Sequence, residues 1–147
     1  MITFKPLEIS KIETIISLMH DFYSIDNYPF DIDVSKQLMI EFISNENLGK
    51  AWLIHQDAMV IGYVILTFIF SFEYQGRIAF IDELYVIENF RGKGIGKQTI
   101  DFIKNEATLL NVKLLYLEVE HHNENAQKLY LANDFDVHNR KLLICKL

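Results

Sequence analysis

The sequence predicts an α/β chain of the α+β type, in which a central, mostly antiparallel sheet is flanked by helices. Three consecutive segments between residues 51 and 86 are rich in β-branched and aromatic residues and are separated by short polar turns, which is typical of antiparallel strands. Apolar residues recur at helical spacing on both sides of this region. A cluster of three glycines lies between the last of these strands and the next helix.

The first forty residues predict one short strand and two helices. The strand, at residues 2–4, ends at Pro6, and a helix that ends near Ser24 follows. One face of that helix is apolar, formed by Ile12, Ile15, Ile16 and Met19. The stretch 26–31 contains Asn, Asp and Pro and is expected to be a loop, after which apolar residues between 38 and 42 predict a shorter helix.

The rest of the chain predicts a hairpin, further strands and two more helices. Strands at 51–55 and 60–70 are joined by a tight turn near Gln56 and Asp57. In chain order, the elements expected after them are a strand at 77–86, a helix at 95–110, a strand at 113–119, a helix at 125–133 and a closing strand at 141–147. Together the elements give one domain, residues 1–147, with six to seven strands and about four helices.

Composition and charge limit the kinds of binding partner and the cellular compartment that we expect for this chain. Half of the residues are hydrophobic and 23% are charged, which suits a folded core. The formal net charge of −6 disfavours nucleic acid as a partner. A single cysteine, Cys145, and an N-terminus without a signal-peptide pattern favour the cytoplasm. The apolar run 61–72 is shorter than the roughly 20 residues that cross a bilayer, so no membrane association is expected.

The segment from Arg91 to Gly96 has the composition of a phosphate-binding loop. It lies between a strand and a helix, where free backbone amides and the helix dipole attract anions. A Walker A loop would need a glycine in place of Arg91 and a hydroxyl in place of Gln98, and a dinucleotide fingerprint would need a glycine at Lys97. By itself the loop is equally compatible with an exposed turn that caps a helix.

The resemblance of two longer segments to a known family favours the phosphate-binding loop over the helix-capping turn. The first is Phe80-Ile-Asp-Glu-Leu-Tyr-Val-Ile-Glu-Asn-Phe-Arg-Gly-Lys-Gly-Ile-Gly96, and the second is Leu117-Glu-Val-Glu-His-His-Asn-Glu-Asn-Ala-Gln-Lys-Leu-Tyr130. Together they resemble the two characteristic segments of the GNAT superfamily of N-acetyltransferases. The resemblance implies the GNAT fold and acetyl-CoA as cosubstrate. One departure is Asp134-Phe135 where the family often has Gly-Phe, and Asp is expected to adopt the same left-handed turn.

The resemblance also implies where the cofactor binds. The backbone of Leu84, Tyr85 and Val86 would pair with the pantetheine arm like an added strand. Asn123 would contact the cofactor where the strands diverge, and Tyr130 would reach its sulfur. The pyrophosphate would be held by the loop residues Arg91, Gly92, Lys93, Gly94, Ile95, Gly96 and Lys97.

An amine attacks a thioester only when it is neutral, and its free pKa is about 10, so a base must take its proton. By resemblance the candidate bases are Glu118 and Glu83, and Asp82 and Glu83 are candidates for acceptor binding. Tyr28, in the loop after the first helix, is a further candidate for acceptor binding. Strand alternation would place Asp82 and Glu83 on opposite faces, so at most one of the two is expected to line the acceptor site. Each carboxylate is also compatible with a plain surface role.

Tyr130 is the candidate acid, because its hydroxyl would donate a proton to the departing thiolate. The alternative is a core aromatic residue with its hydroxyl at the rim. The adjacent His121 and His122 point apart on an extended chain, so no metal is expected. Cys145 has no motif that indicates a nucleophile, which favours direct attack in a ternary complex.

These residues predict an acetyl-CoA-dependent N-acetyltransferase that acts on the primary amine of a small molecule. The alternatives are acetylation of protein N-termini or lysines, and a non-catalytic module that only binds acetyl-CoA. Many members of the family form homodimers, and the predicted last strand at 141–147 is the candidate for such an interface.

Overall fold

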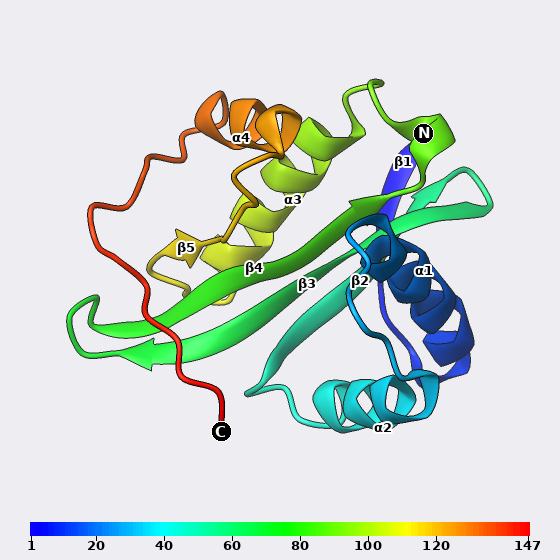
Figure 1. Ribbon diagram of the computed structural model, residues 1–147, viewed down its shortest axis with the longest axis horizontal. Helices are drawn as coiled ribbons and strands as arrows, with labels where there is room; N and C mark the ends of the chain where they lie inside the picture. Colours follow the sequence, from blue (N-terminus) through cyan, green and yellow to red (C-terminus); the bar gives the residue numbers. More distant parts are fainter.

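The computed structural model describes residues 1–147 and contains a five-stranded sheet with helices on both faces (Figure 1). The strands are β1 (Ile2–Pro6), β2 (Gly49–Gln56), β3 (Met59–Ser71), β4 (Gly76–Val86) and β5 (Leu115–Tyr116). The helices are α1 (Ile12–Ile25), α2 (Ile32–Ile43), α3 (Ile95–Leu109) and α4 (Glu124–Leu131), with short 3₁₀ turns at Ile9–Lys11 and Glu88–Phe90. The spatial order is β1-β2-β3-β4-β5, and only the β4–β5 pair is parallel.

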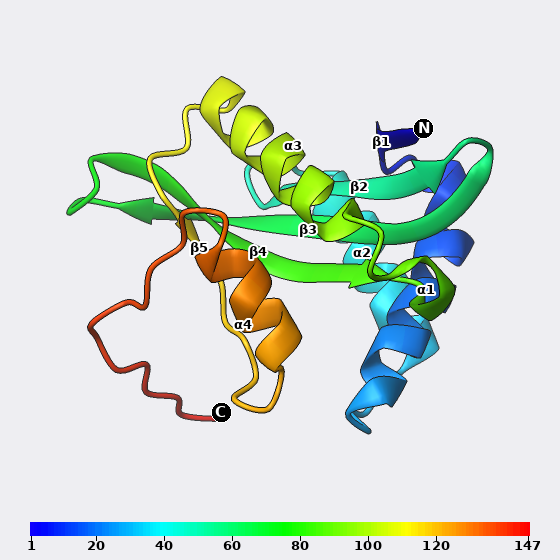
Figure 2. The same ribbon diagram turned by 90° about the horizontal axis from the view of Figure 1, so that it is seen from above.

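Side-chain alternation along the central strands builds a core on each face of the sheet. Leu53 of β2 and Tyr63 of β3 pack in the cluster with α1 and α2, whereas Trp52 and Val64 pack in the cluster with Ile103 of α3. Figures 1 and 2 show the corresponding layers, with α1 and α2 on one side of the strands and α3 and α4 on the other. Both faces of the central strands are therefore buried, which explains their nearly continuous apolar sequence.

A β-bulge interrupts the alternation of β4. Ile65 of β3 pairs with Glu83 and the next residue, Leu66, pairs with Ile81, so Asp82 is the extra residue. Because a bulge adds one residue to a strand, side chains on either side of it no longer alternate between the two faces with a period of two. Ile81 faces the α3 side with Leu66, while Glu83 stays on the α1 side with Tyr63. The sequence contains no glycine or proline at this point that signals the bulge.

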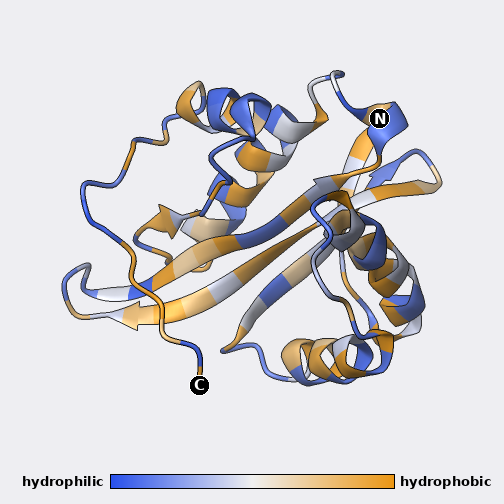
Figure 3. Cartoon of the chain, in the orientation of Figure 1, coloured by the Kyte–Doolittle hydropathy of each residue, from blue (hydrophilic) through white to orange (hydrophobic).

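The prediction for the C-terminal part of the sheet is wrong. β5 is only two residues long where a strand at 113–119 was expected, and residues 141–147 form no strand. No backbone hydrogen bond involves a residue after Phe135, and Leu143 and Ile144 are 87% and 79% exposed. Figure 3 shows the hydrophobic residues of this last segment outside the packed layers. The expectation failed because a strand needs a partner, and the short β5 does not provide one that this segment reaches.

Two smaller features agree with the sequence. Asp134 adopts the expected left-handed conformation with φ 70° after α4. α2 begins earlier than expected because Asp31 caps it, with a side-chain oxygen that accepts a hydrogen bond from the Val34 amide at 3.0 Å. None of the helices has both the length and the apolar composition needed to cross a bilayer.

Candidate active site

The divergence of β4 and β5 opens the space in which the site forms. The two strands pair only at Ala79–Leu115 and Phe80–Tyr116, so residues 81–86 of β4 have no strand partner on that side. Beyond this point lies a cavity of about 630 Å³. Its walls come from α1 and the following loop, from β4, from the segment after β5, and from α4.

Most of the residues expected at the acceptor and thioester end line this cavity. They are Tyr28, Asp82, Glu83, Leu84, Glu118, Asn123 and Tyr130. Tyr85, Val86 and the glycine loop do not line it. Asp82 and Glu83 both do, which corrects the expectation that at most one of the two would. The physical reason is the bulge at Asp82, which breaks the alternation that the expectation assumed.

The charges at the cavity wall are of one sign. Five carboxylates contribute to the lining, from Asp26, Asp82, Glu83, Glu118 and Glu120, and no lysine or arginine does. Burial, and then the nearby charge of Glu118, raise the pKa of Asp82 above its ordinary value. The cavity therefore favours a cation over a neutral or anionic ligand.

Glu83 is the most constrained of these carboxylates. Its Oε2 accepts a hydrogen bond from the Tyr23 hydroxyl at 2.8 Å and its Oε1 accepts one from the Tyr63 hydroxyl at 2.7 Å. Burial raises the pKa of Glu83, the two hydrogen bonds lower it in part, and Asp82 adds a smaller rise. Neither Tyr23 nor Tyr63 was predicted at the site, because they lie 60 and 20 residues away from Glu83 in the sequence and no local pattern connects them.

Tyr130 is half-buried and reaches the cavity from α4. Its ring packs edge-on against Phe135, with centroids 5.5 Å apart, and no protein group hydrogen-bonds to its hydroxyl. Burial raises the pKa of Tyr130 to about 12, so the phenol is protonated at neutral pH. Tyr130 thus packs as a core aromatic residue and also has a hydroxyl that is available to donate a proton.

Asn123 is the N-cap residue of α4 and also lines the cavity. Its Oδ1 accepts a hydrogen bond from the Ala126 amide at 3.1 Å and caps α4. The side-chain amide nitrogen remains available to a ligand. Of the two adjacent histidines, His121 lines the cavity while His122 bonds to Asp26 at 3.2 Å.

The glycine loop has the local geometry of an anion site. Gly92 and Gly94 have φ values of 74° and 78°, in the left-handed region, and a Cβ at either position would meet open space. Gly94 precedes α3, whose first turn has no side-chain cap and no acidic residue. The first amides of α3 are therefore free to bind phosphate oxygens, and this cradle fits the pyrophosphate of acetyl-CoA.

The remaining loop residues differ in what they contribute. Gly96 packs closely against α4, and a Cβ there would lie 2.8 Å from Leu129 Cδ2, so that this leucine side chain would have to shift. Arg91 folds back onto β4, where its Nε donates to the Val86 carbonyl at 2.8 Å. Lys97 pairs with Asp101 at 2.7 Å. The positive charges thus lie beside the cradle and are partly engaged within the protein.

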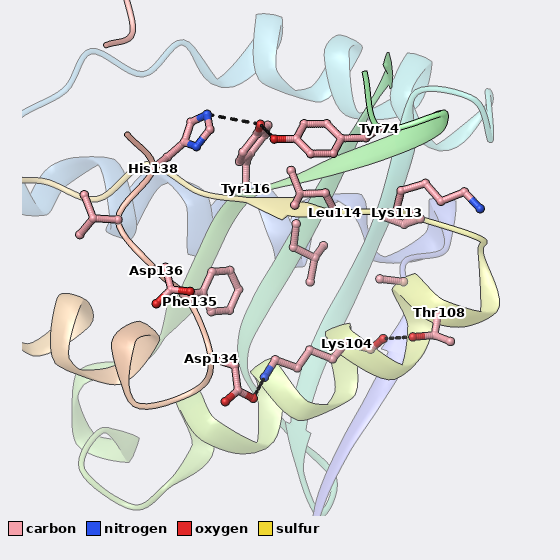
Figure 4. A pocket seen from close by; sticks show the side chains of 14 residues that line it. Tyr74, Lys104, Thr108, Lys113, Leu114, Tyr116, Asp134, Phe135, Asp136 and His138 are labelled. Atoms are coloured by element: carbon pink, nitrogen blue, oxygen red, sulfur yellow. Dashed lines mark hydrogen bonds and ion pairs between the residues drawn. The ribbon is translucent and has the colours of Figure 1, made fainter. Parts of the chain in front are cut away.

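A second cavity of about 450 Å³ lies between α3, β5 and residues 134–138 (Figure 4). Tyr116 bonds to Tyr74 at 3.2 Å there, and Lys104 pairs with Asp134 at 2.8 Å. None of the residues expected at the cofactor or the acceptor lines it. The acidic cavity, which most of these residues line, is therefore the candidate active site.

Comparison with known proteins identifies the class to which this fold and site belong. The model of the Acetyltransferase (GNAT) family matches residues 14–135, and the chain belongs to that family. The uncharacterized N-acetyltransferase YhfO of Bacillus subtilis is 32% identical over 81 residues, which are 55% of this chain and 54% of YhfO. The D-amino-acid N-acetyltransferase HPA3 of Saccharomyces cerevisiae is 36% identical over 54 residues, 37% of this chain and 34% of HPA3.

Among solved structures, an integron cassette protein from the mobile metagenome of Cole Harbour Salt Marsh is similar over nearly the whole chain. The TM-score is 0.89 at 28% identity, with 98% of this chain and 90% of that chain covered. The chain spans about half or less of the length of the two curated relatives. The comparisons confirm the predicted family and fold, and the named relatives support an acetyl-CoA-dependent acyltransferase.

Proposed function

We propose that the protein transfers an acetyl group from acetyl-CoA to the primary amine of a small, cationic molecule. The observation that carries the proposal is the single-sign lining of the cavity, with five carboxylates and no lysine or arginine. A volume of about 630 Å³ is within the range of small-molecule sites. An acceptor amine reaches such a site as an ammonium ion, and the carboxylates favour that form.

Contacts between two segments of the cavity wall favour a small acceptor over a protein. The loop after α1 and the segment before α4 are linked across the cavity by the Tyr28–Glu120 and Asp26–His122 contacts. A peptide acceptor would need an open groove at this place. Acetylation of protein N-termini or lysines is therefore the second candidate, and a non-catalytic module is the third.

Acetyl-CoA, when bound, supplies an activated acyl group and a thiol leaving group. The free amides of Gly92 to Ile95 would hold its pyrophosphate, and the unpaired edge of β4 at 84–86 would bind its pantetheine arm. Tyr130 and Asn123 lie beyond that edge, at the cavity. These residues would place the reacting carbonyl next to the acidic acceptor end.

The residues of the cavity have complementary tasks in proton transfer. Glu83 accepts the proton that the ammonium must lose, since it is the carboxylate held in a fixed orientation at the wall. Tyr130 donates a proton to the departing sulfur, since its phenol is protonated and unbonded. Asp82 and Glu118 lie close enough to influence one another and attract the acceptor.

The test is thiol release from acetyl-CoA over an acceptor panel. The panel contains diamines, monoamines, amino acids and a peptide with a free N-terminus, and the expected order has cationic small amines first. Glu83→Gln should reduce kcat by about 10²-fold, the lower range for loss of a general base. Glu41→Gln is the matched control, because Glu41 is exposed on α2 outside the cavity.

Two results would contradict the proposal. Turnover of the peptide with none of the small amines would favour the protein acetyltransferase. Tight binding of acetyl-CoA without turnover of any acceptor would favour the non-catalytic module.

A further inference from the structure

We propose that Tyr23 and Tyr63 are positioning residues for Glu83, which hold its carboxylate ionised and directed into the cavity to receive the acceptor ammonium. The inference rests on the proposed function and adds two residues from elements that carry no acetyltransferase motif, α1 and β3. Three elements meet at this carboxylate, because Glu83 itself comes from β4.

The geometry leaves a defined part of the carboxylate free. A carboxylate has about four lone-pair sites, and the two phenols occupy one on each oxygen. Tyr63 is 0% exposed and lies behind Glu83, whereas Tyr23 lines the cavity beside it. The remaining lone pairs therefore face the cavity, where an ammonium can bind.

Each phenol has one proton, and in both contacts that proton is donated to Glu83. Burial, and then the charge of Glu83, raise the pKa of both tyrosines, so both remain protonated donors at neutral pH. The hydrogen bonds favour the ionised form of the carboxylate. They oppose burial and the charge of Asp82, both of which favour the protonated form.

No other charged group near Glu83 can stabilise its ionised carboxylate as these two hydrogen bonds do. Asp82 adjoins it on β4, and Glu118, from the segment after β5, interacts with Asp82. Neither is a donor when ionised, and no lysine or arginine lines the cavity. The two tyrosines are therefore the only groups on the protein side that stabilise the Glu83 charge.

The aromatic rings have a separate packing role, which a phenylalanine would keep. Phe22 meets the Tyr63 ring edge-on, with centroids 6.4 Å apart, and stacks on Tyr85 at 5.4 Å, while the rings of Tyr23 and Phe30 lie 5.0 Å apart. Tyr23→Phe and Tyr63→Phe thus remove one hydroxyl each and leave the apolar contacts in place. Any change in Glu83 can then be assigned to the lost hydrogen bond.

The first experiment measures kcat/KM against pH for the wild type and the two variants. Loss of a hydrogen bond raises the pKa of Glu83, so the acid limb should move to higher pH. A charge-assisted bond corresponds to about one pH unit, expected for Tyr63→Phe, where no water can replace the hydroxyl. Tyr23→Phe should shift the limb by about half as much, because cavity water compensates in part.

Tyr74→Phe is the matched control, since it removes a phenol that bonds to Tyr116 outside the cavity. Its limb should coincide with that of the wild type. A merely structural role of Tyr23 and Tyr63 would lower activity at every pH without moving the limb, and that result would overturn the inference. An equal shift in Tyr74→Phe would overturn it as well.

The second experiment does not depend on turnover. Carbon NMR of glutamate-labelled protein gives the Glu83 carboxyl titration directly, assigned by its disappearance in Glu83→Gln. The midpoint should rise in Tyr63→Phe and Tyr23→Phe and not in Tyr74→Phe. Unchanged midpoints would overturn the inference even if amines are acetylated, whereas shifted midpoints without acetylation of any amine would overturn the proposed function alone.

Discussion

The hydroxyl of Tyr28 donates a hydrogen bond to the carboxylate of Glu120, and so joins the loop after α1 to the segment that leads into α4. The two residues are 92 positions apart in the sequence. Asp26 and His122 make a second contact between the same two segments, at 3.2 Å. Because Asp26, Tyr28 and Glu120 also line the acidic cavity, these contacts connect its opposite walls.

Tyr28→Phe should loosen this connection without removing a proton-transfer group. The expected result is a several-fold higher KM for the acceptor with kcat nearly unchanged, because the variant affects the acceptor walls alone. Hydrogen exchange in residues 26–31 should become faster. Steady-state kinetics and exchange measurements check both, and an unchanged KM with unchanged exchange would show that the contact does not hold the cavity walls.

Tyr130→Phe should lower kcat by about 10- to 100-fold and leave the KM for acetyl-CoA within twofold. The expected loss is at the low end for acid catalysis, because a thiol with a pKa near 8.5 is already a fair leaving group. Packing against Phe135 is preserved, so the melting temperature should not change. An equal loss in kcat and in melting temperature would indicate that Tyr130 acts only in the core.

Gly94→Ala tests the phosphate cradle. The new Cβ has open space, but φ 78° disfavours any L-residue by about 1–2 kcal/mol, so the loop should relax away from its cradle conformation. The dissociation constant for coenzyme A, measured by calorimetry, should rise more than tenfold. Gly76→Ala is the control, with φ 147° at the start of β4, outside both the loop and the cavity. A similar loss of affinity in both variants would show a general effect on folding.

Several of the residues expected at the site from short motifs line the acidic cavity, whereas features that depend on packing between distant elements were not predicted. The glycine loop and the α4 segment were predicted from their resemblance to two short family motifs, and such motifs can be recognised because each lies within one continuous stretch of the sequence. The bulge at Asp82 was missed because it depends on the pairing of β3 with β4. The two-residue period of a single strand carries no information about that pairing. The Tyr23–Glu83–Tyr63 group was missed for a similar reason, since packing of α1 on the sheet brings it together.

Asp82→Asn should stabilise the fold at neutral pH and weaken acceptor binding. The pKa of Asp82 is raised in the folded state, so the folded protein binds its proton more tightly than the unfolded chain. Stability is therefore lost as the pH rises from about 4, the unfolded value, through the raised folded pKa. Thermal melts should show a higher melting temperature for the variant above this window and no difference below it, while the acceptor KM increases.

Deletion of residues 141–147 tests whether the last segment belongs to the fold. No backbone hydrogen bond reaches it, and Leu142, Leu143 and Ile144 are exposed. The segment is anchored before its start, where Arg140 bonds to both oxygens of Glu73 at 3.0 and 3.1 Å. Deletion should therefore leave the melting temperature and the affinity for coenzyme A unchanged.

The same deletion decides whether the segment joins two copies of the chain. No residue of the segment belongs to a core cluster or lines the acidic cavity, so the full chain and the deletion variant should sediment with the same number of copies per particle. A dimer that becomes a monomer on deletion would contradict this and would make 141–147 the interface. Leu143→Asp in the full chain is the matched variant: it places a charge in the segment and keeps its backbone, so it should break an apolar interface and leave a free tail unchanged.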